Sequence, residues 1–276
     1  MIGKINLAFT WLASIGIALI FLRFGTQGTF GQDSHAYWLA LQRDDLYLAG
    51  PTELDAYLYS PLFAQLLIPL GMLTWPAFQG IWLAAGIGAT LWLVKPLPLR
   101  WAVPAALTAS TDLIIGNIYV FLAVTIALAV RAPYVWIFGI LTKITPGVGL
   151  IWMLARREYR AVMHVGVAVV VLIGISAAAD PRAWADWIEL LATSKSGDPT
   201  FIPRCVLAVG LAIWGARRHP AWLAVAVTVA TPVFSAAACF VPLLAIPRLV
   251  EGSRQGRPGN ASTSGSAVLT RLPRGD

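Results

Sequence analysis

A short polar segment, 30–38, carries the first residues whose types suggest chemistry. Asp33 lies in it and is followed by His35 and Tyr37. A carboxylate here could act as a general base toward a hydroxyl group at a membrane surface. It could also cap a helix by accepting free backbone N–H groups, and the two roles are compatible. His35 could bind a phosphate or assist proton transfer, although histidines near a membrane surface often do neither.

One lysine stands alone among apolar residues. Lys143 is the only charged residue in the stretch 134–155, and an ammonium group inside a bilayer is costly enough to require a partner or a purpose. It could neutralise a phosphate group, or it could snorkel to the membrane surface or pair with Asp112. Alternative cations for the phosphate role are Lys95, Arg100, Arg131 and Arg204.

Three tyrosines could line a carbohydrate pocket, because aromatic rings with hydroxyl groups suit a sugar: Tyr37, Tyr57 and Tyr59. Tyrosines are also common at membrane surfaces without a ligand, and the Tyr37 and Trp38 rings suit the headgroup level. Further carboxylates of the same region are second candidates for the base, although a solvated loop explains them better: Asp44, Asp45, Glu53 and Asp55. No set of His, Cys, Asp and Glu has the spacing of metal ligands, so the sequence predicts no metal site.

Apolar helices must position these residues. The chain has 276 residues, of which 58% are hydrophobic and 12% charged, and its mean hydropathy is +0.73. Because soluble domains carry about 25% charged residues, a water-soluble globular protein is excluded. A span needs roughly 20 apolar residues, which allows about eight to eleven spans and no large domain outside the membrane. The net charge of +7 comes from short basic clusters between apolar segments, which does not indicate nucleic-acid binding.

Hydropathy and helix-breaking residues predict an all-α polytopic transmembrane bundle over residues 1–250. The segments 101–111 and 117–131 are short and could be re-entrant. After Glu251 the composition changes to Gly, Ser, Pro, Arg and Thr, which predicts a disordered tail over 251–276. The predicted spans are 5–24, 59–75, 77–94, 101–111, 117–131, 134–155, 161–178, 202–217, 220–233 and 235–248.

Basic residues predict the orientation of this bundle. If the spans alternate, Lys4 and three later basic clusters fall on one side, which the positive-inside rule makes cytoplasmic together with both termini and the tail. Two acidic loops, 25–58 and 180–201, then face outward. The same alternation places three further cations on the outer side, where an active site would explain them: Lys95, Arg100 and Arg131.

Several motifs, taken in order, resemble one family. Asp33 is followed by Tyr57-Leu58-Tyr59-Ser60-Pro61-Leu62, then by Gly116-Asn117-Ile118-Tyr119, and then by a stretch from Gly139 through Lys143 to Pro146. This order resembles the family 87 glycosyltransferases of the GT-C class. That family has an aspartate in its first outer loop, a YxYPP-like entry to the next span, a Gly-Gln-x-Asn element and a Gly-x-x-x-Lys-x-x-Pro stretch. Ser60 replaces the first proline of the pair, and Asn117 replaces the glutamine.

The resemblance implies a GT-C-like fold in a bacterial plasma membrane. It also implies inverting transfer of a hexose, typically mannose, from a polyprenyl-phosphate donor to a lipid or glycan acceptor on the outer face. Asp33 is the expected base, and no cofactor or metal is expected because a lipid phosphate leaves as a stable anion. The residues expected to bind substrate are His35, Tyr37, Tyr57, Tyr59, Asn117 and Lys143.

Two other functions are compatible with the residues alone. A membrane transporter would use Lys143 and Asp112 along a pathway and would not need the loop carboxylates. A scaffold or assembly subunit would tolerate the loss of either set.

Overall fold

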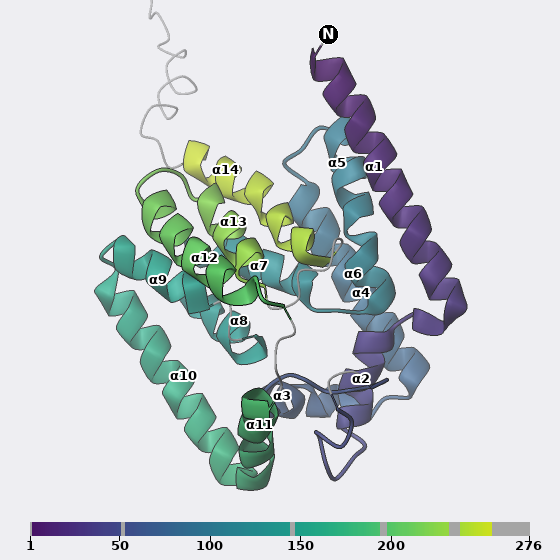
Figure 1. The fold of residues 1–276 in the computed structure, drawn as a ribbon, viewed down its shortest axis with the longest axis vertical. Helices are drawn as coiled ribbons and strands as arrows, with labels where there is room; N and C mark the ends of the chain where they lie inside the picture. The colour runs from purple at the N-terminus through teal and green to yellow at the C-terminus, as the bar shows by residue number, and fades with distance from the viewer. Residues whose placement is uncertain (1, 51–52, 144–146, 194–197, 232–237, 256–276) are drawn as a thin grey trace, which may run out of the picture.

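The computed structural model describes residues 2–50, 53–143, 147–193, 198–231 and 238–255. Every regular element in these ranges is a helix, as the sequence predicts (Figure 1). Within the described part of the chain, three helices are long and apolar enough to cross a membrane: α1 (Ile2–Phe24), which continues through 25–29, α4 (Trp75–Val94) and α10 (Tyr159–Ala179). α1 and α10 bury only 6% and 11% of their most apolar windows. Their remaining surface is suited to lipid.

Most of the other predicted spans are shorter helices than a full crossing needs. The predicted span 134–155 is divided, because α8 ends at Thr142 and Lys143 has extended backbone angles (φ −142°, ψ 133°). Segment 144–146, which contains the Pro146 of the predicted motif, lies outside the described residues. The shorter helices are α5 (Leu99–Thr108), α6 (Ser110–Ile115), α7 (Tyr119–Ala129), α8 (Trp136–Thr142), α9 (Val148–Ala155), α12 (Phe201–Ala216), α13 (Ala221–Val229) and α14 (Ile246–Gln255).

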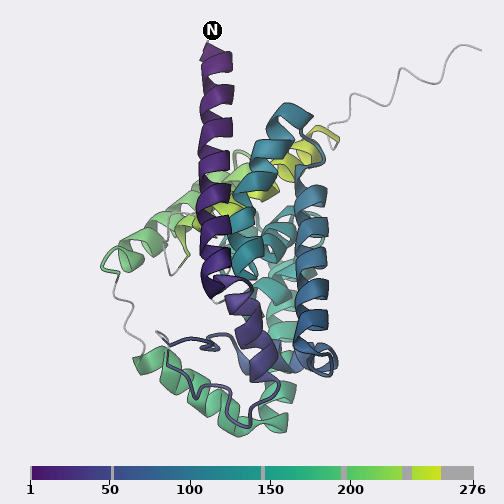
Figure 2. The same cartoon turned by 90° about the vertical axis from the view of Figure 1, so that its right-hand side faces the viewer.

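The predicted span 59–75 does not cross the molecule. It forms α3 (Pro61–Gly71), which begins with a proline after the capping Ser60. The end of α3 stays beside α2 (Gln32–Ala40), because Gln42 Nε2 donates to Gly71 O at 2.7 Å and Trp38 Nε1 donates to Leu73 O at 3.0 Å. Both ribbon views place α2, α3 and α11 (Pro181–Thr193) at one end of the molecule, which we call the site end (Figures 1 and 2). α4 therefore starts at the site end and leads away from it.

This path corrects the predicted placement of two cations. Lys95 and Arg100 follow α4 and lie at the end opposite to the site end, where Trp11 Nε1 of α1 donates to Arg100 O at 3.0 Å. Their predicted placement on the outer side resulted from counting 59–75 as a crossing. Without that crossing, α4 ends and α5 begins on the side of the N-terminal part of α1 (Figure 2).

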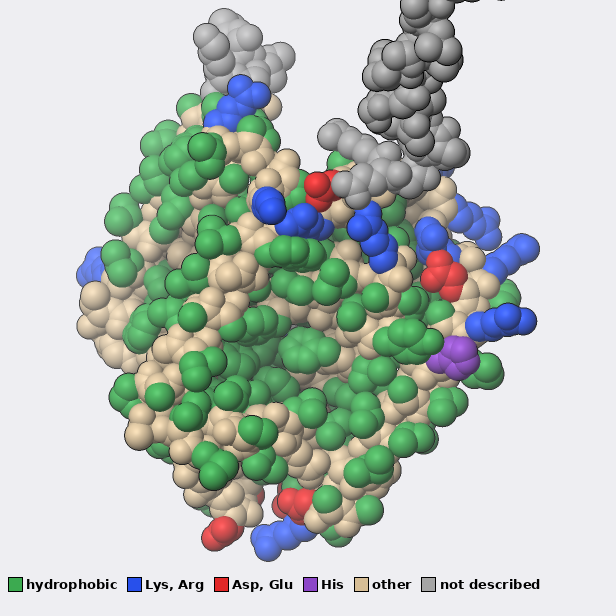
Figure 3. All heavy atoms as spheres, turned by 180° about the vertical axis from the view of Figure 1, so that it is seen from behind, with side chains coloured by type: hydrophobic (Ala, Val, Ile, Leu, Met, Phe, Trp, Pro, Cys, Tyr) green, Lys and Arg blue, Asp and Glu red, His purple; other side chains and the backbone are tan. Residues whose placement is uncertain are grey.

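The predicted placement of Arg131 on the outer side is wrong for the same reason. A Cβ atom on Gly252 of α14 would lie 3.1 Å from Arg131 Nη2, and α14 is fixed to the last turns of α4 by Arg248 Nε, which donates to Trp92 O at 2.8 Å. Most Lys and Arg side chains on the back of the molecule accordingly lie in its upper half (Figure 3). α14 runs to Gln255, and the rest of the predicted tail, 256–276, lies outside the described residues.

The two predicted outer loops meet at the site end. The later one is largely helical, because α11 occupies most of it and buries Trp184 against Leu62 of α3 and Leu141 of α8. A second core of aromatic residues from α2, α3, α4 and the segment before α3 lies beside it: Tyr37, Tyr57, Tyr59, Phe63 and Phe78. This aromatic core forms the floor on which the predicted site residues lie.

Candidate functional site

α2 starts directly after the first span at a glycine in the left-handed region. Gly31 has φ 73°, and its N–H donates to Ile114 O at the end of α6 at 2.7 Å. A side chain there would meet Gln79 of α4, since a Cβ atom would lie 2.7 Å from Gln79 Nε2. Asp33 falls in the first turn, and Gly31 occupies the cap position without a side-chain cap bond. The predicted N-cap role of Asp33 is therefore not present.

Asp33 instead contacts the turn between α6 and α7. Asn117 Nδ2 donates to Asp33 Oδ2, and Asn117 Oδ1 accepts from the N–H of Ile118 at 2.7 Å. Two residues that are 84 positions apart in the sequence are thus joined directly.

Lys143 lies over aromatic rings in the same cluster. Its Nζ atom is 3.7 Å from the ring centroid of Tyr119 and 5.5 Å from that of Tyr59, which are cation–π distances. Among the described residues, no carboxylate lies within ion-pairing distance of Lys143. The predicted pairing with Asp112 is absent, because the Asp112 carboxylate accepts the N–H groups of Tyr119 at 3.3 Å and Val120 at 2.8 Å.

The Asp33 carboxyl lies beyond the end of the first span and is partly buried. Burial raises the pKa of Asp33 above its usual range, while the Lys143 charge and the Asn117 hydrogen bond act to lower that pKa. A carboxylate whose pKa is raised is a stronger proton acceptor than the carboxylate of an exposed aspartate.

The predicted tyrosines form one wall of this cluster. Tyr37 lies on the same face of α2 as Asp33, one turn later, and its hydroxyl donates to the Tyr59 hydroxyl at 2.9 Å. Tyr37 is 1% exposed, so it lies in the core and not at the headgroup level. Tyr57 is equally buried, and its hydroxyl donates to Ser60 O at 2.9 Å. Its ring packs against that of Tyr59 with a centroid distance of 5.8 Å. Tyr59 therefore connects Tyr37 to the ammonium of Lys143.

His35 is not part of this cluster. Because it follows Asp33 by two residues, it lies on the opposite face of α2. Its Nδ1 atom is 2.7 Å from Asp55 Oδ1, and its ring packs against Trp38 and Trp75 with centroid distances of 5.8 and 4.7 Å. The Asp55 side chain is only 16% exposed, so it is a packing partner of α2 and not a solvated loop residue as predicted.

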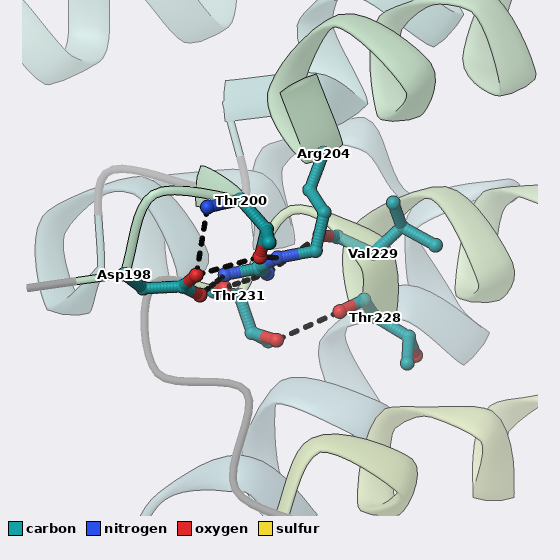
Figure 4. Close-up of polar contacts among 6 residues, drawn as sticks. All are labelled: Asp198, Thr200, Arg204, Thr228, Val229 and Thr231. Atoms are coloured by element: carbon teal, nitrogen blue, oxygen red, sulfur yellow. Dashed lines mark hydrogen bonds and ion pairs between the residues drawn. The ribbon is translucent and has the colours of Figure 1, made fainter. Parts of the chain in front are cut away.

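The alternative cations are also held elsewhere. Arg204, at the start of α12, donates to Thr231 O at 2.6 Å and Val229 O at 3.1 Å, and it pairs with Asp198 at 2.5 Å (Figure 4). Lys95, Arg100 and Arg131 lie at the opposite end, as described above. Lys143 is the cation of the described residues that the structure brings to Asp33.

Sequence reasoning missed two features of the site. Tyr119, which packs against the Lys143 ammonium, lies in the same motif as Asn117, two residues later, so the motif itself carried a signal. The second missed feature is the role of Asp112, which the sequence suggested only as a charge partner of Lys143. Asp112 caps α7, and this role depends on a turn that no local sequence pattern specifies. The described residues contain no group of three or more His, Cys, Asp or Glu side chains that could hold a metal ion.

Asp33 has one carboxylate oxygen that accepts no hydrogen bond from the described residues, and Lys143 pairs with no carboxylate among them. The two groups are suited to different tasks. The first can accept a proton from a hydroxyl group, and the second can stabilise an anionic leaving group such as a phosphate. The Tyr59 ring, 5.5 Å from the Lys143 ammonium, is an aromatic surface beside these groups.

Comparison with known proteins supplies the family. The model of glycosyltransferase family 87 matches residues 57–269, a range that contains Tyr59, Asn117 and Lys143 and begins after Asp33. Searches of curated proteins and of solved structures found no match. The family match covers well over half of the chain, and the three long apolar helices are consistent with a membrane protein. The chain therefore belongs to glycosyltransferase family 87 and is an integral membrane glycosyltransferase.

Proposed function

We propose that the protein transfers a hexose, in the first instance mannose, from a polyprenyl-phosphate donor to a hydroxyl group of a lipid or glycan acceptor, with inversion at the anomeric carbon. The observation that carries this proposal is the placement of Asp33 and Lys143 in one cluster, where Lys143 acts electrostatically on Asp33 and pairs with no described carboxylate. The two groups match the two charges that develop in such a transfer.

The proposed reaction is a single displacement. Asp33 accepts the proton of the acceptor hydroxyl as its oxygen forms a bond to the anomeric carbon. The bond between that carbon and the phosphate oxygen breaks, and its electron pair stays on the phosphate. Lys143 neutralises the phosphate as its charge grows. The sugar lies against Tyr59 in this arrangement, and His35 takes no part because it faces Asp55.

The site end is proposed to face outward, with both termini in the cytoplasm. Lys95 and Arg100 at the opposite end support this orientation, because basic residues are retained on the cytoplasmic side. A polyprenyl chain would then reach the cluster from the bilayer.

The test is transfer of labelled mannose from polyprenyl-phosphate mannose to membrane lipid by the full chain in vesicles containing EDTA. We expect Asp33→Asn to lower kcat by about 10²–10⁴-fold, the usual contribution of a general base. Asp44→Asn changes an exposed aspartate of the same loop and should leave kcat unchanged. Equal transfer by wild type and Asp33→Asn, at equal protein amounts, would remove Asp33 from the chemistry.

Lys143 is tested in the same assay. Lys143→Gln should raise the KM for the donor by about 10–100-fold, as expected when a charge-assisted hydrogen bond is lost. Lys95→Gln, at the opposite end, should not change it. Absence of transfer by the wild type from both mannose and glucose donors would overturn the proposed donor class. Loss of wild-type transfer with EDTA would instead show that a metal ion is needed.

A further inference from the structure

The turn between α6 and α7 holds the Asp33 carboxylate from one side. Both polar atoms of the Asn117 side chain are engaged, Nδ2 with Asp33 Oδ2 and Oδ1 with the N–H of Ile118 at 2.7 Å. An amide bound at both atoms cannot rotate without losing a hydrogen bond, so Asn117 presents its donor to Asp33 in one orientation. Among the described residues, none donates to the other carboxylate oxygen, Asp33 Oδ1.

Asp112 fixes this turn. It is 1% exposed, and its backbone carbonyl accepts the N–H groups of Gly116 at 2.8 Å and Asn117 at 3.0 Å. Its carboxylate accepts the N–H groups of Tyr119 and Val120, which are otherwise unpaired at the start of α7. One residue therefore ties the beginning of the turn to its end, and its carboxylate is not available as a second base.

α2 is attached to the same turn through main-chain atoms. Gly31 N donates to Ile114 O at 2.7 Å, and Trp82 Nε1 of α4 donates to Gly116 O at 2.9 Å. The backbones that carry Asp33 and Asn117 are thus fixed on both sides of their contact. This arrangement limits the positions that the Asp33 carboxylate can take.

We propose that Asn117 is a positioning residue for Asp33. It holds Oδ2 so that Oδ1 is left toward the acceptor hydroxyl, and Asp112 holds Asn117 in place. This inference rests on the proposed function, in which Asp33 is the base. It replaces the direct contact with substrate that the family resemblance implied for Asn117, since the amide carbonyl and one N–H are already engaged.

The first test is the pH dependence of mannose transfer by Asn117→Leu, whose side chain has the same branching and no hydrogen-bond donor. Misplacement of a base by about 1 Å can cost 10²-fold, so we expect kcat to fall by about that factor while the KM for the donor changes little. Because the Asn117 hydrogen bond acts to lower the pKa of Asp33, its removal should move the acid limb of the profile to higher pH. Asn117→Gln keeps an amide donor and should restore part of kcat.

Asn6→Leu is the matched control, because it makes the same change on the exposed surface of α1 and should alter neither quantity. Asn117→Ala serves as the second variant if Asn117→Leu does not fold. A wild-type enzyme that transfers mannose, together with Asn117 variants that keep its kcat and its acid limb, would overturn the positioning role and leave the proposed function intact.

The second readout does not need transfer. Dicyclohexylcarbodiimide reacts with protonated carboxyl groups, so labelling of Asp33 against pH, followed by peptide mass spectrometry, reports its protonation. We expect the midpoint for Asp33 to move to higher pH in Asn117→Leu and to stay unchanged in Asn6→Leu. An unchanged midpoint would overturn the contact. A shifted midpoint in a protein that transfers no sugar would support the contact and reject the proposed function.

Discussion

At the scale of single residues, the hydrogen bonds that Asp112 makes determine whether the charge of Lys143 is neutralised. If Asp112 paired with Lys143, the two charges would cancel and no anion would be attracted. Asp112 instead caps α7 with both carboxylate oxygens, and the Lys143 ammonium is held by the Tyr119 ring. A cation–π contact stabilises an ammonium without neutralising it. The charge of Lys143 therefore remains available to a phosphate.

Gly116 provides a prediction at the same scale. Its φ of 79° lies in the left-handed region, and a Cβ atom there would overlap the Ser34 side chain of α2. Gly116→Ala should therefore destabilise the protein by at least about 1 kcal/mol, which corresponds to a Tm lower by about 2–4 °C, and it should slow transfer by moving Asn117 away from Asp33. Thermal unfolding in detergent measures the first effect.

Gly88→Ala is the control for this substitution. Gly88 lies within α4, and a Cβ atom there would meet nothing within 4 Å. Alanine is the better helix former by about 0.8–1.0 kcal/mol, so this variant should be at least as stable as the wild type. If Gly116→Ala and Gly88→Ala unfolded at the same temperature, the close approach of α2 to the turn would not be important.

The residues of the site could be predicted only in part. Asp33 and Tyr37 are four positions apart on one helix, so their common face follows from helix geometry alone. The same geometry could have excluded His35, which is two positions from Asp33. The contact of Asp33 with Asn117 could not be derived from spacing, because it joins the start of α2 to a turn 84 residues later.

At the scale of elements, hydropathy identified apolar segments correctly and their paths less well. The stretch 59–75 is apolar enough for a span, but α3 has only 11 residues and ends at Gly71. Tertiary contacts keep α3 at the site end, namely the hydrogen bonds that Gln42 and Trp38 donate to the backbone at and just after its last residue. Hydropathy records how apolar a segment is, and it contains no information about such contacts.

Arg204 gives a prediction for the packing of α12 against α13. Its side chain is 13% exposed and donates to Val229 O and Thr231 O at the end of α13 while it pairs with Asp198 (Figure 4). Arg204→Gln would leave these acceptors without their donor, so we expect the Tm to fall by roughly 4 °C or more. Arg182→Gln, in an ion pair whose arginine is 82% exposed, should change the Tm by less than about 2 °C.

The pH dependence of this difference has a definite sign. Hydrogen bonds from Thr200 and Arg204 hold the pKa of Asp198 below its usual range. A lowered pKa contributes stability above the unfolded-state value of 3.8, and this contribution is lost as the pH falls further through the folded-state value. The Tm difference between wild type and Arg204→Gln should therefore shrink on acidification below about pH 4. A difference that stayed constant would assign the effect of Arg204 to its carbonyl contacts alone.

At the scale of the whole molecule, the corrected path of α3 removes the conflict between three cations and the positive-inside rule. Lys95, Arg100 and Arg131 contradicted the positive-inside rule as long as 59–75 was counted as a crossing. With α3 at the site end, these cations lie with Trp11 of α1 and with α14, away from the two acidic loops. The apolar surfaces of α1 and α10 lie between the two ends, as a bilayer requires.

This arrangement predicts which residues share a side of the membrane. In a chain whose Cys205 and Cys239 are replaced by serine, single cysteines at Leu48, Met72 and Lys95 can be labelled in intact cells with a membrane-impermeant maleimide. Leu48 and Met72 are 73% and 88% exposed at the site end. Both should react in intact cells, whereas Lys95→Cys should react only after permeabilisation.

Labelling of Leu48→Cys and Met72→Cys from opposite sides would mean that α3 crosses the membrane after all. Labelling of Lys95→Cys alone in intact cells would keep α3 in place and reverse the whole molecule, which would move the Asp33 and Lys143 cluster to the cytoplasmic face.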